Sequence, residues 1–232
     1  MEQKQYLSDA EARAAIIEVG KRIYQKGYVA ANDGNISCRI SENEILVTPT
    51  GVSKGYMTPE SMVRMNLDGE ILSEGKPSSE VKMHIRAYQE NPEINAVVHA
   101  HPIVSTSFSI VGLEMAQPVV SEAVLVTGNI LIAPYAEPGS YEVPEAIAPY
   151  VKDYNAVLLA NHGALSWGRD LYQALYRMEA LEHQAQIYFH SLLLAHITGK
   201  DVNYLSKEAN ENLVKIRERM GVTTGGFPKA DR

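Results

Sequence analysis

The stretch Ile94-Asn95-Ala96-Val97-Val98-His99-Ala100-His101 sets the centre of the predicted fold, because it is an apolar strand that runs directly into two histidines. Side chains of a strand alternate between its two faces, so His99 and His101 point the same way. Two imidazoles on one side of a strand end can share one metal ion. The stretch therefore predicts both a buried strand and a candidate metal site at its end.

A second apolar strand, at 156–160, ends in a similar way. It leads into Asn161-His162-Gly163, and a short predicted helix that includes Glu80 precedes the first strand. Three histidines at the ends of two buried strands, with a glutamate nearby, are typical of an open catalytic metal site rather than a closed structural one. The residues alone leave a second interpretation open, in which the three histidines are ordinary core or loop residues.

Regular elements flank these two strands, and one α/β domain is the simplest interpretation of their order. A capping box of Ser8 and Glu11 begins the first helix, which Gly27 ends. A long helix begins at its N-cap Asp170 and ends at Gly199. Further strands are expected at 36–40, 45–48, 63–67, 70–72, 123–126 and 130–133, and further helices at about 79–89, 104–111 and 144–150.

The composition is that of a globular protein. The 232 residues are 45% hydrophobic and 21% charged, and the net charge of −7 argues against nucleic acid or an anionic membrane as a partner. No apolar stretch is long enough to cross a bilayer, and the first residues lack the apolar core of a signal peptide. The single cysteine, Cys38, forms no internal disulfide and predicts a cytoplasmic location. We expect one domain over residues 1–232, with a mobile tail over 221–232.

Three polar loops have the composition of an anion site. They are 33–37, which opens a strand, 48–51, which closes one, and 77–80, which begins a helix. Each offers small residues, hydroxyls and backbone N–H groups, and a helix N-terminus favours an anion. Each loop alone is an ordinary turn or cap. The three together predict a phosphate cradle.

Five motifs, in this order, resemble the class II aldolase/adducin family, and the resemblance covers nearly the whole chain. The motifs are Gly34-Asn35-Ile36-Ser37, Thr48-Pro49-Thr50-Gly51, Lys76-Pro77-Ser78-Ser79-Glu80, His99-Ala100-His101-Pro102 and Asn161-His162-Gly163. Within the family they are most similar to the L-fuculose-1-phosphate aldolase branch. The resemblance implies a three-layer α/β/α sandwich with a central mixed, largely antiparallel sheet. It also implies a homotetramer with fourfold cyclic symmetry, in which apolar positions around 119–126 supply an interface.

The resemblance implies a role for each matching residue. His99, His101 and His162 bind one Zn²⁺ per chain, and Glu80 completes the resting site and then acts as the proton-transferring base. A neutral imidazole triad leaves the ion its positive charge, which stabilises the negative charge that develops during retro-aldol cleavage. The implied phosphate-binding residues are Gly34, Asn35, Thr50, Gly51, Ser78 and Ser79.

The expected function is that of a zinc-dependent aldolase, a lyase that cleaves a ketose 1-phosphate into dihydroxyacetone phosphate and an aldehyde. The expected substrate is L-fuculose 1-phosphate or a 5-deoxypentulose 1-phosphate. Epimerase, dehydratase and decarboxylase reactions of sugar phosphates are alternatives with the same fold. Glu80 favours carbon–carbon cleavage over epimerisation, because the family's epimerases typically have aspartate there. A non-catalytic, adducin-like structural module is a remote alternative, because it requires lost metal ligands and all of them are present.

Other polar residues receive weaker assignments. The acid on the aldehyde side stays open between Glu122, Tyr135 and a residue of a neighbouring subunit, and Tyr135 is expected to be buried by packing. His84 is expected near solvent or at the rim of the site. His183 and His190, which share a face of the long helix, are expected to pack or to contact another subunit rather than bind a metal.

Overall fold

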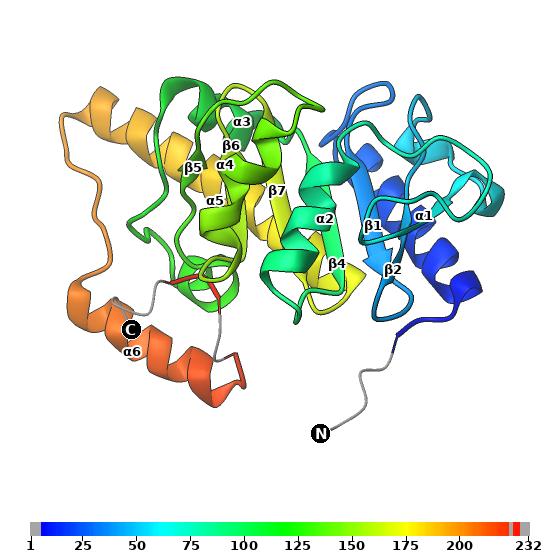
Figure 1. Cartoon of the computed structure of the whole chain (residues 1–232). Coiled ribbons are helices and arrows are strands. Elements are labelled where there is room, and N and C mark those ends of the chain that lie inside the picture. Colours follow the sequence, from blue (N-terminus) through cyan, green and yellow to red (C-terminus); the bar gives the residue numbers. More distant parts are fainter. Residues whose placement is uncertain (1–5, 223–224, 228–232) are drawn as a thin grey trace.

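The computed structural model of the protein describes residues 6–222 and 225–227, and its centre is a seven-stranded sheet in the order β3-β2-β1-β4-β7-β6-β5 (Figure 1). Neighbouring strands are antiparallel except β5 and β6, which pair in parallel. This is the mixed, largely antiparallel sheet that was predicted. The strands are β1 (Asn35–Arg39), β2 (Glu44–Val47), β3 (Val63–Asn66), β4 (Ala96–Ala100), β5 (Ile132–Ala133), β6 (Ala156–Leu159) and β7 (Gly163–Gly168).

The helices that were predicted begin and end near the residues that their sequence signals indicate. The Ser8 and Glu11 capping box is formed at the start of the first helix, and Asp170 accepts a hydrogen bond from the Gln173 N–H at the start of the long helix. Gly199 ends the long helix in the left-handed conformation. The helices are α1 (Asp9–Gln25), α2 (Val81–Glu90), α3 (Ile103–Val111), α4 (Glu142–Val151), α5 (Leu171–Thr198) and α6 (Lys207–Arg219).

Two hydrophobic cores lie on opposite faces of the sheet, because the side chains of each strand alternate between them. Val98 and Ala100 of β4 pack with residues of α1, α3 and α5. Val97, which precedes Val98 and has its side chain on the other face, packs with residues of α2 and α4. The helical layers and the sheet form the predicted three-layer sandwich (Figure 1). His99 shares the face of Val97, so it points toward the layer that contains α2.

The prediction of a strand at 123–126 is wrong, because Ala123–Thr127 forms a π-helix. Its β-branched residues favoured a strand. The structure instead closes a wide turn in which the Gly128 N–H donates to the Ala123 carbonyl over 2.7 Å. Thr127 Oγ1 also donates to that carbonyl, over 3.1 Å. Gly128 has a φ of 74°, which a strand would not contain.

The sequence did not indicate β7 and α6. β7 begins and ends in glycine and contains Ser166, so, unlike the equally buried β4 and β6, it has no continuous apolar run by which a buried strand is recognised. α6 packs against the π-helix and follows α5 after the connection at 199–206 (Figure 1). The predicted strand at 70–72 is reduced to a single bridge between Met65 and Ile71.

The tail predicted to be mobile over 221–232 is described only in part. Residues 223–224 and 228–232 lie outside the described residues. Gly225, Gly226 and Phe227 are buried, and the Asn129 N–H donates to the Gly226 carbonyl over 2.7 Å. This part of the tail is packed against the body of the protein.

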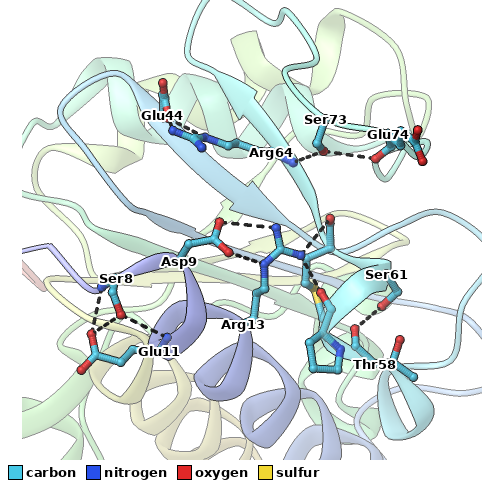
Figure 2. A network of polar contacts seen from close by, with 12 residues as sticks. Ser8, Asp9, Glu11, Arg13, Glu44, Thr58, Ser61, Arg64, Ser73 and Glu74 are labelled. Carbon is cyan, nitrogen blue, oxygen red and sulfur yellow. Dashed lines mark hydrogen bonds and ion pairs between the residues drawn. The ribbon is translucent and has the colours of Figure 1, made fainter.

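Arg13 of α1 anchors the loop that follows β2. Its guanidinium donates to the carbonyls of Pro59 and Met62 and is paired with Asp9 (Figure 2). The loop therefore has a fixed position relative to α1 at its far end. Its near end, 48–51, is one of the three loops proposed from the sequence to bind phosphate.

Candidate metal centre

The three strand-end histidines, His99, His101 and His162, meet at one point. Their nearest ring nitrogens all lie within 4.8 Å of one another, and the Nε2 atoms of His99 and His101 are 3.1 Å apart. β7 pairs with β4, with Ala164 opposite Ala100, and this pairing brings the turn that contains His162 to the end of β4. The three histidines that were predicted to lie together therefore do so in the structure.

The hydrogen-bond partners of the rings indicate where each ring proton lies. His99 Nδ1 lies 2.9 Å from the Ala164 carbonyl oxygen, which only accepts, so Nδ1 carries the proton. His101 Nδ1 lies 3.5 Å from a carboxylate oxygen of Asp33, which favours the same tautomer. The Nε2 lone pairs of both rings then face each other across 3.1 Å. Two facing lone pairs repel, and a metal cation between them removes that repulsion.

Burial keeps these rings neutral, which is the form that binds a metal. Desolvation lowers the pKa of His99 to about 3, and it also lowers the pKa of His101. The rings offer lone pairs at neutral pH without first losing a proton. This is the charge state that a metal centre requires.

Glu80 faces the strand-end histidines from the N-terminus of α2. It occupies the N-cap position, but its side chain forms no capping hydrogen bond. Oε1 lies 3.2 Å from His162 Nε2, and Oε2 lies 3.5 Å from His99 Nε2. Burial raises the pKa of Glu80, but His99, His162 and the Asn35 amide together lower it below its usual range, so the group is a carboxylate at neutral pH.

The donor set fits a metal ion. Oε1 of Glu80 is buried and has no hydrogen-bond partner of good geometry among the described residues. Buried polar atoms of native proteins are normally paired, so this one requires an explanation. Three imidazole nitrogens and one carboxylate oxygen that face a common point are the ligands of a tetrahedral zinc-type site.

The turn that contains His162 depends on its two neighbours. Asn161 has a φ of 56°, the left-handed conformation that asparagine tolerates better than most residues. A side chain at Gly163 would meet His101 Cδ2 at 2.5 Å and the Ala100 carbonyl oxygen at 2.6 Å. The Asn-His-Gly sequence therefore allows the turn to approach the end of β4 closely enough for the rings to meet.

All six residues proposed from the sequence to bind phosphate line one cavity beside the metal cluster. The cavity measures about 270 Å³, and Glu80, His101 and His162 line it as well. Two of its loops are held together, because the Thr50 N–H donates to the Lys76 carbonyl and the Ser78 N–H donates to the Thr48 carbonyl. The residues that the structure brings together here are Gly34, Asn35, Thr50, Gly51, Ser78 and Ser79.

Two of these six residues have further contacts. Asn35 Nδ2 donates to Glu80 Oε2 over 2.9 Å. A side chain at Gly34 would meet the His99 carbonyl oxygen at 2.8 Å. Gly34 is thus needed for close packing against β4, whatever its contact with a ligand. Both residues connect the cavity to the metal cluster.

Lys54 also lines this cavity, although no sequence motif pointed to it, and so does Asp33, the first residue of the 33–37 loop. The Lys54 side chain is buried, and its Nζ donates to the carbonyls of Asn32 and Val52 over 2.9 and 2.6 Å. Burial lowers the pKa of Lys54 to about 8, although the nearby carboxylates of Asp33 and Glu80 raise it. Only the position of Lys54 just after Thr50-Gly51 could have signalled it, and lysine in a loop is common.

His84 is fully buried, so its expected place near solvent or at the rim is wrong. Tyr135 is 63% exposed, so the buried packing role expected for it is also wrong. Neither Tyr135 nor Glu122 lines the cavity among the described residues. His183, His190 and His196 are exposed along α5.

Comparisons with known proteins identify the family of this chain. The family model for the class II aldolase and adducin N-terminal domain matches residues 14–189. A 3-oxo-tetronate 4-phosphate decarboxylase of Haemophilus influenzae is 31% identical over 204 residues, which cover 86% of this chain and 94% of the relative. An L-fuculose phosphate aldolase of Methanococcus maripaludis is 37% identical over 171 residues, which cover 74% of this chain and 92% of the relative.

A solved structure gives the same result. The crystal structure of YgbL from Escherichia coli, described as a putative aldolase/epimerase/decarboxylase, superposes with a TM-score of 0.81 at 30% identity. The superposition covers 89% of this chain and 99% of that one. The fold, the motifs and the matched region agree, and the chain belongs to the class II aldolase and adducin family.

Proposed function

We propose that the protein is a zinc-dependent lyase that cleaves a ketose 1-phosphate into dihydroxyacetone phosphate and an aldehyde. L-Fuculose 1-phosphate and a 5-deoxypentulose 1-phosphate are the substrates we favour. The observation that carries the proposal is the buried Glu80 Oε1 at one end of a polar cavity, which lies 3.2 Å from His162 Nε2 but has no hydrogen bond of good geometry among the described residues. The other end of the cavity offers hydroxyls, backbone N–H groups and the Lys54 ammonium, which suit a phosphate.

In this proposal the strand-end histidines hold the metal, with Glu80 beside them. A zinc ion supplies Lewis-acid stabilisation of the negative charge that develops when the carbon–carbon bond breaks. The donor set supports zinc, because imidazole nitrogen and carboxylate oxygen in fourfold coordination suit that ion. During cleavage, the carbon that loses its bond to the aldehyde fragment gains a proton from Glu80, and in the reverse, aldol direction Glu80 takes a proton from that carbon. Ser78, Ser79, Thr50 and Lys54 bind the phosphate.

A decarboxylase reaction is the second candidate, and one observation favours it. Neither Glu122 nor Tyr135 lines the cavity, so a single chain offers neither of the predicted aldehyde-side acids there. Loss of carbon dioxide from a 3-oxo-tetronate 4-phosphate requires no such group. That reaction and the aldol cleavage leave the same three-carbon product, dihydroxyacetone phosphate. The metal and phosphate ends of the site would therefore serve either reaction.

A substrate panel with two readouts tests both candidates. The zinc-loaded protein is incubated with ketose 1-phosphates and with a 3-oxo-tetronate 4-phosphate, and dihydroxyacetone phosphate and carbon dioxide are measured separately. We expect dihydroxyacetone phosphate from a ketose 1-phosphate without carbon dioxide. Release of both products from the 3-oxo acid alone would establish the second candidate. No turnover of either class, with zinc bound, would refute the lyase proposal.

We also propose that the protein acts as a cytoplasmic homotetramer, in which a neighbouring subunit can supply the missing acid. Phe189, Leu193, Leu194 and Ile197 leave an exposed apolar face on the last turns of α5, which supports self-association. Within 119–126, Val124 is buried and Val126 is exposed, so this segment offers a smaller surface than the sequence suggested. Among the described residues, no helix has the length and apolar character needed to cross a membrane. Light scattering at micromolar concentration tests the assembly, and a monomer would refute it.

A further inference from the structure

A continuous line of buried polar side chains runs from the core of the protein to Glu80. It passes through Tyr88, Ser37, His84 and Asn35, and we call it the hydrogen-bond chain. Tyr88 and His84 belong to α2, whereas Ser37 and Asn35 belong to β1. Ser37, His84 and Tyr88 are at most 1% exposed. Polar groups so deep in the core require mutual pairing, and each of these is paired.

The direction of each hydrogen bond follows from Glu80. Its carboxylate only accepts, so the Asn35 group 2.9 Å from Oε2 is the amide nitrogen. The carbonyl oxygen of Asn35 then faces His84 Nε2 over 2.6 Å and must accept from it. Nε2 of His84 therefore carries a proton. The orientation of the Asn35 amide and the tautomer of His84 are thus linked.

The remaining two bonds take the same direction. Burial lowers the pKa of His84 to about 4, so the ring is neutral and its Nδ1 has no proton. Nδ1 accepts from the Ser37 hydroxyl over 2.7 Å. Ser37 has then used its only proton, so the Tyr88 hydroxyl donates to Ser37 Oγ over 2.8 Å. Every donor in the chain points toward the carboxylate.

We propose that His84, as the neutral Nε2–H tautomer, is a positioning residue that fixes the Asn35 amide and thereby orients Glu80 for proton transfer. Asn35 holds Oε2 and leaves Oε1 free toward His162. If the amide turned over, a carbonyl oxygen would face the carboxylate, and the repulsion would move Glu80 away from the metal cluster. His84 prevents this, because its Nε2–H cannot pair with an amide N–H group. The catalytic consequence rests on the proposed lyase function.

Two variants of nearly equal volume separate orientation from packing. His84→Gln keeps one donor and one acceptor on a single planar group, whereas His84→Met keeps neither. We expect His84→Met to lower kcat by about 10- to 100-fold, the usual effect of removing an outer partner of a metal-site ligand. We expect KM to change less than kcat, because Asn35 is only one of the six predicted phosphate-binding residues, and we expect bound zinc to change little, because the strand-end histidines are intact. His84→Gln should lose less than about threefold in kcat, because it retains the required donor.

A spectroscopic measurement on the wild-type protein tests the chain without any variant. Nitrogen-15 NMR of the imidazoles should show His84 with a protonated Nε2 and a bare Nδ1, unchanged between about pH 5.5 and 8 because its pKa is about 4. Ser37→Ala removes the donor to Nδ1 and should shift the population of the two tautomers.

The outcomes are distinct. A His84 ring protonated at Nδ1, or equal kcat values for the Gln and Met variants at equal zinc content, would overturn the inference. A wild-type protein inactive on every substrate would refute the proposed function, and the observed tautomer would still decide whether the chain orients Asn35. If the Met variant does not fold, the wild-type tautomer and the Gln variant carry the test.

Discussion

Two groups of three histidines lie in this chain, and only one forms a cluster. The strand-end histidines bring their ring nitrogens within 4.8 Å of one another. The helix histidines, which we define as His183, His190 and His196, are exposed along α5, and the His190 ring donates only to the Gln186 carbonyl one turn earlier. The two groups have the same chemistry, so the difference lies in the elements that position them.

The contrast shows that a metal centre requires a backbone that fixes the direction of its ligands, in addition to the right residue types. Paired strands fix the direction of each side chain, and the β4–β7 register brings His162 to the end of β4 although it is far away in sequence. Buried rings stay neutral and bound by their second nitrogen, which leaves the first as a ligand. The helix histidines are exposed on one helix, where no sheet register brings their rings together.

The largest effect is expected from His162→Ala. The variant should lose bound metal and turnover together, because two imidazoles and one carboxylate are a weaker site than three imidazoles and one carboxylate. The melting temperature of the metal-free proteins should differ little, since His162 lies in a turn and not in a core. Metal analysis, turnover and thermal unfolding check these three statements. An active, zinc-loaded variant would show that the strand-end histidines do not form the metal centre.

Glu80→Gln should act on proton transfer without removing the metal. The variant keeps the shape of the side chain and an acceptor for Asn35. Zinc should stay bound, because the three strand-end histidines are unchanged. Turnover should fall by about two to four orders of magnitude, the usual range for a general acid–base group. Exchange of the carbon-bound proton of dihydroxyacetone phosphate with D₂O should fall in parallel. Near-normal exchange would show that another group moves the proton.

Lys54→Met should weaken phosphate binding. KM should rise by roughly tenfold or more, because a hydrogen bond to a charged group contributes about 1.5–3 kcal/mol. Lys82→Met is the matched control, since Lys82 Nζ also donates to a backbone carbonyl, that of Gly139, but does not line the cavity. An unchanged KM in Lys54→Met would assign the residue to loop structure alone.

The pH dependence of KM offers a second view of Lys54. Burial lowers its pKa to about 8 from an ordinary value of 10.5, so the ammonium is charged below that pH and loses its proton above it. KM for a phosphorylated substrate should therefore rise as the pH passes through about 8. In Lys54→Met that rise should be absent. Titration of initial rates for both proteins checks the sign.

The smallest effect is expected from the double substitution of His183 and His190 by alanine. Both side chains are exposed, so the free energy of unfolding should change by no more than about 0.5 kcal/mol. Metal content and turnover should equal those of the wild type. Loss of zinc from this variant would mean that the helix histidines form a metal site of their own.

The sequence by itself determined most of the helices and strands, and it determined which motifs carry the candidate metal and phosphate ligands. Ser8 with Glu11 and Asp170 with Gln173 predicted helix starts that the structure contains, since capping depends on neighbouring residues. Strands that end in histidine predicted where the cluster lies. The sequence could not indicate β7, because this strand is bounded by glycines and interrupted by Ser166, so it has no continuous apolar run. The prediction of a strand at 123–126 was wrong, because the turn at Gly128 outweighed the strand propensity of the β-branched residues.

Tertiary structure alone decided the environment of each polar group. His84 follows Glu80 by one helical turn, so the sequence placed it near the site, but only the packing of α2 on β1 buried it and gave it Ser37 and Asn35 as partners. Lys54 became a cavity residue only because two loops fold around its side chain. Local sequence fixes helices, turns and strand direction because those depend on near neighbours. Burial, protonation and hydrogen-bond partners depend on residues far apart in the chain, and these arise only when the sheet assembles.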